Sequence, residues 1–191
     1  TLDMALKALD AGVDGLVVEG GEGGGFKNPR PVSTMVLLPL IRERTDVPII
    51  AAGGICDGPT MAAAFALGAE GVQLGTAMLS CADSPVHQNW KQAIYDGKET
   101  DTVFLNQQGR PALRAMRTGR TGELELLGQF QPFEHMANIL DLYFGGDLEA
   151  AIPLTGQVMG RIHESRSAAE VVTSTMEGFH ACLAGLSASY S

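Results

Sequence analysis

The chain has 191 residues, 45% of them hydrophobic, which is enough for one domain, or most of one, with a real core. Its formal net charge of −9 argues against nucleic acid or an anionic membrane as a partner, since both require a basic surface. No apolar run is long enough to cross a bilayer, and the opening residues do not read as a signal peptide. Because the chain opens with Thr1, we expect the natural protein to begin earlier.

The cysteines and histidines show no metal-binding pattern. The three cysteines lack a CxxC spacing and a histidine partner, so we expect reduced thiols in a cytoplasmic protein. The four histidines share no ligand spacing, and we expect them at the surface or in helix packing. We therefore predict no metal site. The residues concerned are Cys56, Cys81, Cys182, His87, His135, His163 and His180.

The first part of the chain alternates apolar strands with helices. Hydrophobic periodicity and glycine or proline punctuation define three such repeats, about 30 residues apart. The predicted strands are 13–19, 47–51 and 70–74, and the predicted helices are 2–11, 33–43 and 59–67. Strands that are apolar throughout are typical of a parallel sheet buried on both faces. The pattern predicts an α/β fold with right-handed crossovers.

After Gly75 the pattern changes. Helical periodicity dominates, and one intervening segment, 100–118, is mixed and polar. We expect a helical layer here rather than further strand–helix repeats. The predicted helices are 85–96, 133–144, 147–159 and 167–185.

Glycines stand at the carboxyl ends of the second and third predicted strands. Gly53 and Gly54 follow the second strand, and Gly75 and Thr76 follow the third. In a (β/α)8 barrel, backbone N–H groups after the last two strands commonly hold a phosphate. The pattern therefore predicts a site for a phosphate-bearing cofactor or substrate. The alternative is that these glycines only end strands and begin helices.

Three strands do not close a barrel, which typically takes about 250 residues. The fold we predict is therefore the C-terminal part of a (β/α)8 TIM barrel, with about three βα units, followed by a helical region. We expect the remaining strands to come from a preceding segment or from another chain.

Several segments together resemble the nitronate monooxygenase family, which includes 2-nitropropane dioxygenase and the FMN-dependent enoyl-acyl-carrier-protein reductase. They are 15–25, 37–39, 48–58, 68–76, Lys91, Asp101, Thr102, Arg114 and 156–160. The resemblance implies an FMN-binding barrel. On this basis we expect residues 1–84 to form its C-terminal half, and residues 85–191 to form a mainly helical substrate or cap region with the closing helices.

The resemblance also implies which residues bind FMN. Glycines of the loop after the first strand have no Cβ and let backbone approach the flavin ring, although a flexible surface loop is the alternative. We place Phe26 and Gln157 on the substrate side, where the alternatives are loop packing and helix capping. The predicted cofactor-binding residues are Gly24, Gly25, Ala52, Gly53, Gly54, Leu74, Gly75 and Thr76.

One position departs from the family pattern. The family loop usually reads Glu-Ala-Gly-Gly-His, whereas this chain has Phe26 at the histidine position. Phenylalanine cannot act as a general base, so the catalytic residue is left unassigned. Glu19 and Glu22 are candidate acid–base carboxylates, although a glutamate at a barrel rim is more often solvated or hydrogen-bonded.

The resemblance implies an FMN-dependent oxidoreductase acting on a nitronate or an enoyl-thioester-like substrate. One alternative is an enoyl-ACP or enoyl-CoA reductase with NADH or NADPH as donor. Another is a non-catalytic flavin- or phosphate-binding remnant. The expected partners are a small-molecule or acyl-thioester substrate and the missing N-terminal half of the barrel, with a homodimer as a further possibility.

Overall fold

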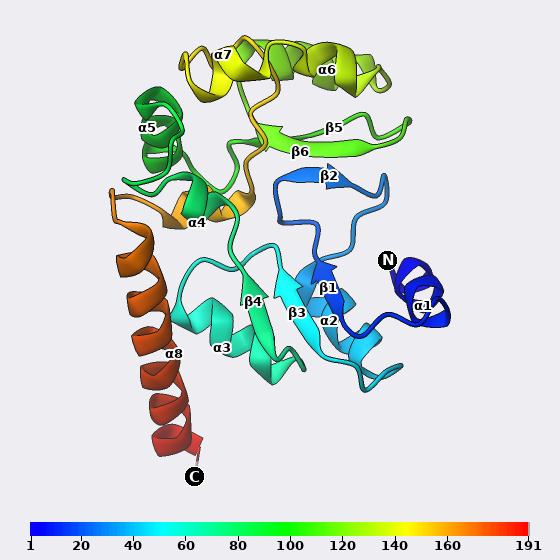
Figure 1. Ribbon diagram of the computed structural model, residues 1–191, viewed down its shortest axis with the longest axis vertical. Helices are drawn as coiled ribbons and strands as arrows, with labels where there is room; N and C mark the ends of the chain where they lie inside the picture. The colour runs from blue at the N-terminus through cyan, green and yellow to red at the C-terminus, as the bar shows by residue number, and fades with distance from the viewer. Residues whose placement is uncertain (191) are drawn as a thin grey trace.

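The computed structural model describes residues 1–190 and contains two three-stranded sheets (Figure 1). The first is parallel, in the order β1-β3-β4, and is formed by β1 (Leu16–Glu19), β3 (Ile49–Ala52) and β4 (Gly71–Gln73). The second is antiparallel, in the order β2-β6-β5, and is formed by β2 (Gly25–Lys27), β5 (Thr102–Leu105) and β6 (Ala112–Met116). In Figure 1 the antiparallel sheet lies beyond the carboxyl ends of the parallel strands.

Helices cover one face of the parallel sheet. The buried side chains Val18, Ile49 and Ala51 on that face form a core with helices α2 and α3. The helices of this part are α1 (Leu2–Asp10), α2 (Thr34–Arg42) and α3 (Gly58–Ala66). The predicted strand–helix repeats are therefore confirmed, with shorter strands than expected.

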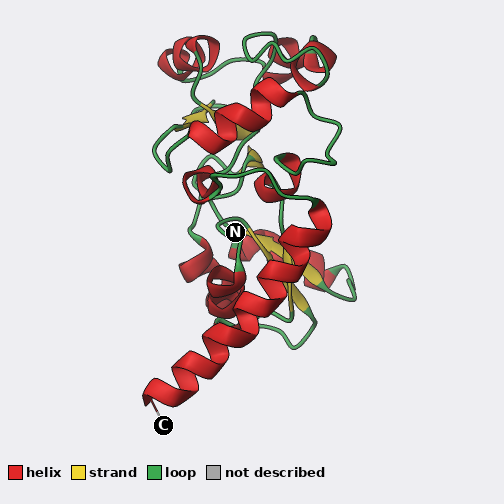
Figure 2. Cartoon of the chain, turned by 90° about the vertical axis from the view of Figure 1, so that its left-hand side faces the viewer, coloured by secondary structure: helices red, strands yellow, loops and turns green. Residues whose placement is uncertain are grey.

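Helix α3 shows how the sequence sets these elements. Asp57 caps its first turn, accepting from the Thr60 backbone N–H at 3.0 Å while the Thr60 side chain reciprocates. The helix ends just before Gly68, whose φ of +101° suits glycine. The long helix α8 (Ala168–Tyr190) packs on α3, where Gly58 lies so close to Gly178 that no side chain fits between the helices. Figure 2 shows α8 running past the parallel sheet to the C-terminus.

The second half of the chain contains strands that the sequence did not predict. The segment expected to be mixed and polar, 100–118, holds the hairpin β5–β6, and β2 from the glycine-rich loop pairs with β6. A division at residue 84 therefore separates β2 from the sheet to which it belongs. The helix expected over 147–159 does not form. The only helical element there is the short 3-10 helix η2 (Gln157–Arg161).

The remaining helices of the second half cover the antiparallel sheet or surround Trp90. Helix α6 buries Leu124 against Val103, Leu105 and Leu113 of the antiparallel sheet. The expected helix over 133–144 is divided into two short pieces. The elements are α4 (Thr76–Leu79), α5 (Gln88–Asp96), α6 (Gly119–Leu127), η1 (Pro132–Met136) and α7 (Ile139–Tyr143).

The other face of the parallel sheet is open. Val17 and Ile50 are paired in the register of β1 and β3, and they are 56% and 41% exposed. Among the described residues, β1 and β4 each pair with β3 alone, so each has a free edge. A free edge and an exposed apolar face are features that folded proteins usually cover. No helix of residues 1–190 is long and apolar enough to cross a membrane.

Candidate functional site

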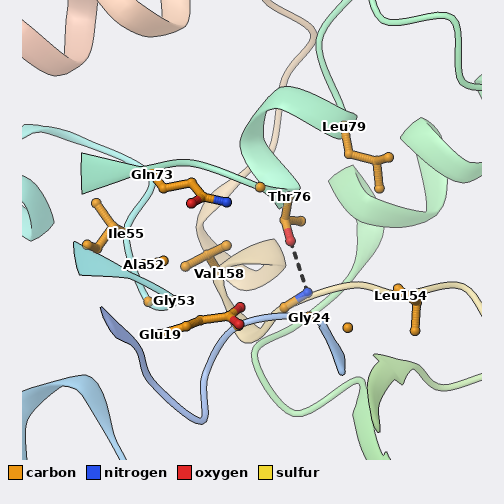
Figure 3. Close-up of a pocket in the computed structure, with 15 residues that line it drawn as sticks. Glu19, Gly24, Ala52, Gly53, Ile55, Gln73, Thr76, Leu79, Leu154 and Val158 are labelled. Atoms are coloured by element: carbon orange, nitrogen blue, oxygen red, sulfur yellow. Dashed lines mark hydrogen bonds between the residues drawn. The ribbon is translucent and has the colours of Figure 1, made fainter. Parts of the chain in front are cut away.

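A pocket of about 280 Å³ lies where the carboxyl ends of the parallel strands meet the segment 154–158 (Figure 3). Glycine supplies almost half of its lining, so backbone rather than side chains forms much of its wall. The lining residues are Glu19, Gly23, Gly24, Gly25, Ala52, Gly53, Gly54, Ile55, Gln73, Gly75, Thr76, Leu79, Leu154, Gly156 and Val158.

The glycines after β3 and β4 form one side of this pocket. Gly53 and Gly54 adopt φ angles of +79° and +78°, a conformation that side-chain-bearing residues rarely take. Gly75 has an ordinary φ of −102°, and a Cβ there would meet nothing within 4 Å. Thr76 begins helix α4, so its N–H has no acceptor earlier in that helix. Backbone donors and open space therefore meet at this corner, as an anion requires.

The opposite wall is built by close backbone packing. A Cβ on Gly24 would lie 2.7 Å from the carbonyl carbon of Thr155, so only glycine fits. The Gly156 N–H donates to Thr76 Oγ1 at 2.9 Å, and Trp90 Nε1 donates to Thr155 Oγ1 at 3.1 Å. These bonds fix segment 154–158 against the first residue of α4 and against helix α5.

Glu19 is the only ionisable side chain among the residues that line the pocket. It leaves the end of β1, and its carboxylate points into the pocket in Figure 3. Its Oε1 lies 2.6 Å from Nζ of Lys27, whose side chain is 5% exposed, compared with 40% for Glu19. Burial lowers the pKa of Lys27, and the hydrogen bond and charge of Glu19 oppose this effect.

Glu22 has a different environment. Its carboxylate accepts from the Thr34 backbone N–H at 3.0 Å and from Thr34 Oγ1 at 3.0 Å, at the first residue of α2. Its backbone oxygen accepts from the Gln157 N–H at 2.9 Å. Glu22 therefore holds the loop and α2 together and does not line the pocket.

The structure brings together most of the residues predicted to bind cofactor. Gly24, Gly25, Ala52, Gly53, Gly54, Gly75 and Thr76 all line the pocket.

Three predicted site residues do not line the pocket. Leu74 packs among apolar side chains beside α8, because the alternation along β4 turns Gln73 rather than Leu74 toward the pocket. Phe26 is paired with Leu113 in the register of β2 and β6, and its ring lies 5.9 Å from that of Phe133. Gln157 meets the glycine-rich loop through its backbone N–H.

Several pocket residues were not predicted from the sequence. Gln73, Leu79, Leu154, Gly156 and Val158 come from a strand, a short helix and an irregular segment without periodicity. The Gly156–Gln157 pair was a usable signal, but it indicated the glutamine rather than the glycine.

Cys56 and His87 have structural environments. Cys56 is buried, and burial, followed by the charge of Asp57, raises the pKa of its thiol, which disfavours the nucleophilic thiolate. His87 caps helix α5 by accepting from the Asn89 N–H at 3.1 Å. Within residues 1–190, no group of three or more His, Cys, Asp or Glu side chains is placed to hold a metal ion.

The chain is therefore an α/β protein whose parallel strands end at a glycine-lined pocket. Comparison with known proteins then gives the family. The family model described as nitronate monooxygenase matches residues 1–178, and the chain belongs to this family of oxidoreductases.

Individual relatives agree with this assignment. A protein of Staphylococcus saprophyticus named "Probable nitronate monooxygenase" is 38% identical over 122 residues, which are 59% of this chain and 34% of the relative. A protein of the same name from Staphylococcus aureus strain Newman is 44% identical over 112 residues, 54% of this chain and 32% of the relative. These matches extend over about one third of the curated relatives.

Two solved structures resemble nearly the whole chain. FabK from Thermotoga maritima is 31% identical with a TM-score of 0.91, covering 98% of this chain and 61% of FabK. Nitroalkane oxidase from Streptomyces ansochromogenes is 24% identical with a TM-score of 0.85, covering 97% of this chain and 57% of that protein. At this identity the second likeness concerns the fold alone.

Proposed function

We propose that this chain is the cofactor-binding part of an FMN-dependent oxidoreductase of the nitronate monooxygenase type. Its substrate is a nitronate or an enoyl-thioester-like compound. The observation that carries the proposal is the pocket in Figure 3, where glycines from the ends of β3 and β4 face a glycine-rich loop. Family membership supports the same conclusion.

The pocket residues fit a flavin mononucleotide. Gly53, Gly54, Gly75 and Thr76 would hold its phosphate through backbone N–H groups, since no lysine or arginine lines the pocket. Gly24 and Gly25 would let backbone approach the ring. FMN supplies the electron transfer when bound, and the protein contributes binding, orientation and exclusion of water.

We also propose that the chain is the C-terminal part of a (β/α)8 barrel and requires the N-terminal strands, in cis or from another chain. The exposed Val17 and Ile50 and the two free sheet edges support this proposal. So does the chain's coverage of only 61% of FabK. The added strands would pair with the free edges and cover the apolar face.

An enoyl-thioester reductase that uses NADH or NADPH is the second candidate. FabK, an enoyl-ACP reductase, resembles nearly the whole chain at 31% identity and a TM-score of 0.91, which supports this candidate. Phe26 also removes the imidazole that the family resemblance implies for nitronate oxidation. Reduction of an enoyl double bond by hydride transfer does not need a base at that position. It does need an acid that protonates the carbon that does not receive the hydride.

Spectroscopy of the purified full-length protein tests these proposals. A yellow protein with a flavin absorption band is expected, and the 191-residue chain alone should bind FMN weakly. Anaerobic bleaching by NADH or NADPH would favour the reductase, and oxygen uptake with propyl nitronate would favour the oxidase. A colourless full-length protein that does not take up FMN would contradict the proposed function. A 191-residue monomer that co-purifies with stoichiometric FMN would contradict the barrel proposal.

A further inference from the structure

We propose that Glu19 is the acid–base residue of this site, with Lys27 as its positioning residue. The proposal deepens the proposed function and rests on it. Glu19 would remove a proton from the carbon next to the nitro group of a neutral nitroalkane, so that the site accepts nitroalkanes as well as nitronates.

Glu19 is the candidate among the pocket residues that this chain supplies. It is the only ionisable side chain in the lining, and the other polar side chains there, Gln73 and Thr76, do not titrate near neutral pH. Glu22, three residues further on, is bound to Thr34 and lies outside the lining. Phe26 has no titratable group.

The location of Glu19 suits proton transfer. Its side chain is 40% exposed, and its carboxylate reaches into the pocket beside Gly24, whose backbone we assign to the flavin (Figure 3). It is attached to the end of β1, whose backbone is fixed by pairing with β3. A group on a strand is held more rigidly than a group on a loop.

Lys27 fixes the direction of that carboxylate. Its Nζ lies 2.6 Å from Glu19 Oε1 and donates to the Gly24 carbonyl at 3.3 Å. The other charged groups near Lys27 are Glu22, which is held by Thr34, and Arg114, which donates to the Gly21 carbonyl at 2.6 Å. Glu19 is therefore the direct ion-pair partner of a buried ammonium, which holds its carboxylate in place.

The step is balanced without any redox change. The carbon–hydrogen bond next to the nitro group breaks, its electron pair remains on carbon and delocalises onto the nitro oxygens, and an O–H bond forms on Glu19. The reverse transfer returns the proton and restores the carboxylate. Lys27 transfers no proton in this step.

Hydrogen–deuterium exchange isolates this step from the flavin chemistry. Full-length holoprotein is incubated anaerobically in D₂O with nitroethane, and loss of the methylene proton signal is followed by NMR. The Glu19→Gln variant should lower the protein-catalysed exchange rate by about 10²–10⁴-fold, the usual contribution of a positioned base. Glu19→Asp, which keeps a carboxylate, should retain part of the exchange, and Glu177→Gln on the exposed surface of α8 should match the wild type.

Lys27 is tested by the rate of the same exchange. Lys27→Met should lower the exchange rate while FMN stays bound, because the Glu19 carboxylate loses the ammonium that fixes its direction. Lys27→Arg, which keeps a cationic donor, should restore the rate, whereas an equal loss in Lys27→Arg and Lys27→Met would contradict the positioning role.

The remaining outcomes are decisive against the proposal. Wild-type exchange no faster than buffer, or equal exchange by Glu19→Gln with its flavin still bound, would overturn it. Exchange that falls only in proportion to lost flavin would overturn it in favour of a cofactor-binding role for Glu19. Because nitroethane exchange needs no electron transfer, these results remain distinct from a colourless wild type, which would contradict the proposed function itself.

Discussion

Replacing Gly75 by valine tests whether the corner between β3 and β4 binds the cofactor phosphate. The φ of −102° at Gly75 is accessible to any residue, and a Cβ would meet nothing within 4 Å. The substitution is therefore expected to leave the fold intact. The same branched side chain would stand beside the glycines of the pocket and keep an anion away from their N–H groups.

The size of the effect follows from the bonds that would be lost. Hydrogen bonds to a charged group are worth about 1.5–3 kcal/mol each, so losing one or two raises the FMN dissociation constant by roughly 10–10⁴-fold. The free energy of unfolding should change by less than about 1 kcal/mol, because the backbone conformation is compatible with a side chain. Flavin titration by fluorescence and urea denaturation of the full-length protein measure these two quantities.

Gly122→Val provides the matched control. Gly122 lies in α6, outside the pocket, and a Cβ there also meets nothing within 4 Å. Its flavin affinity should equal that of the wild type. If Gly75→Val binds FMN as tightly as this control, the phosphate does not lie against Gly75 and the assignment of this corner is wrong.

Three further substitutions give separate tests. Gly24→Ala places a Cβ 2.7 Å from backbone across the pocket and should lower the free energy of unfolding by about 1–3 kcal/mol in urea denaturation, whereas an unchanged midpoint would contradict the close packing. Burial opposes ionisation of Asp57, but hydrogen bonds from Arg161 and from the first turn of α3 outweigh it and lower the pKa of Asp57. Because the folded pKa lies below the unfolded one, the stabilisation is complete above the unfolded value, near 3.9, and is lost as the pH falls through the folded value. Asp57→Ala should cost about 0.5–2 kcal/mol at neutral pH and remove that part of the acid dependence, as thermal melts at several pH values would show. Phe26→His should raise oxygen uptake with propyl nitronate by far less than the 10²–10⁴-fold of a positioned base, because residue 26 does not line the pocket, and a larger gain would show that the loop rearranges.

The parallel sheet and its glycines were predictable because their signals are local. An apolar run of four or five residues followed by glycine defines a buried strand and its end without reference to distant residues. Since parallel strands place their carboxyl ends on one edge, Gly53, Gly54 and Gly75 had to converge.

The antiparallel sheet was not predictable in the same way. In β6, the two residues before Arg114 and the two residues after it are all buried. The strand therefore lacks the alternation of buried and exposed residues that identifies a half-buried strand. Its partner β2 is only three residues long and lies almost ninety positions earlier in the chain. Such pairing depends on tertiary contacts that no sequence window contains.

Strand phase limited the prediction of individual side chains. Shifting the predicted alternation of a strand by one residue moves every side chain to the opposite face. Strand β4 has only three residues, too few to show from the sequence which of them face the pocket. Leu74 was expected in the pocket from the family resemblance, and so short a strand offered no phase that would have indicated Gln73 instead. Glu19 and Glu22 were likewise equivalent in sequence, and only the contacts of Lys27 and Thr34 distinguish a pocket carboxylate from a structural one.

The phase of β2 also changes how Phe26 is understood. Phe26 opposes Leu113, which is fully buried in the core beneath α6, whereas Gly25 opposes Arg114, whose guanidinium reaches the Gly21 carbonyl on the side of the parallel sheet. The side chain at position 26 therefore lies on the face of the antiparallel sheet that carries Leu113, and Lys27 lies on the opposite face. Lys27, the residue after Phe26, contacts the pocket residue Glu19 through an ion pair. Loss of the histidine therefore leaves no vacant position in the pocket, and the acid–base group that we propose among the residues of this chain comes from the end of β1.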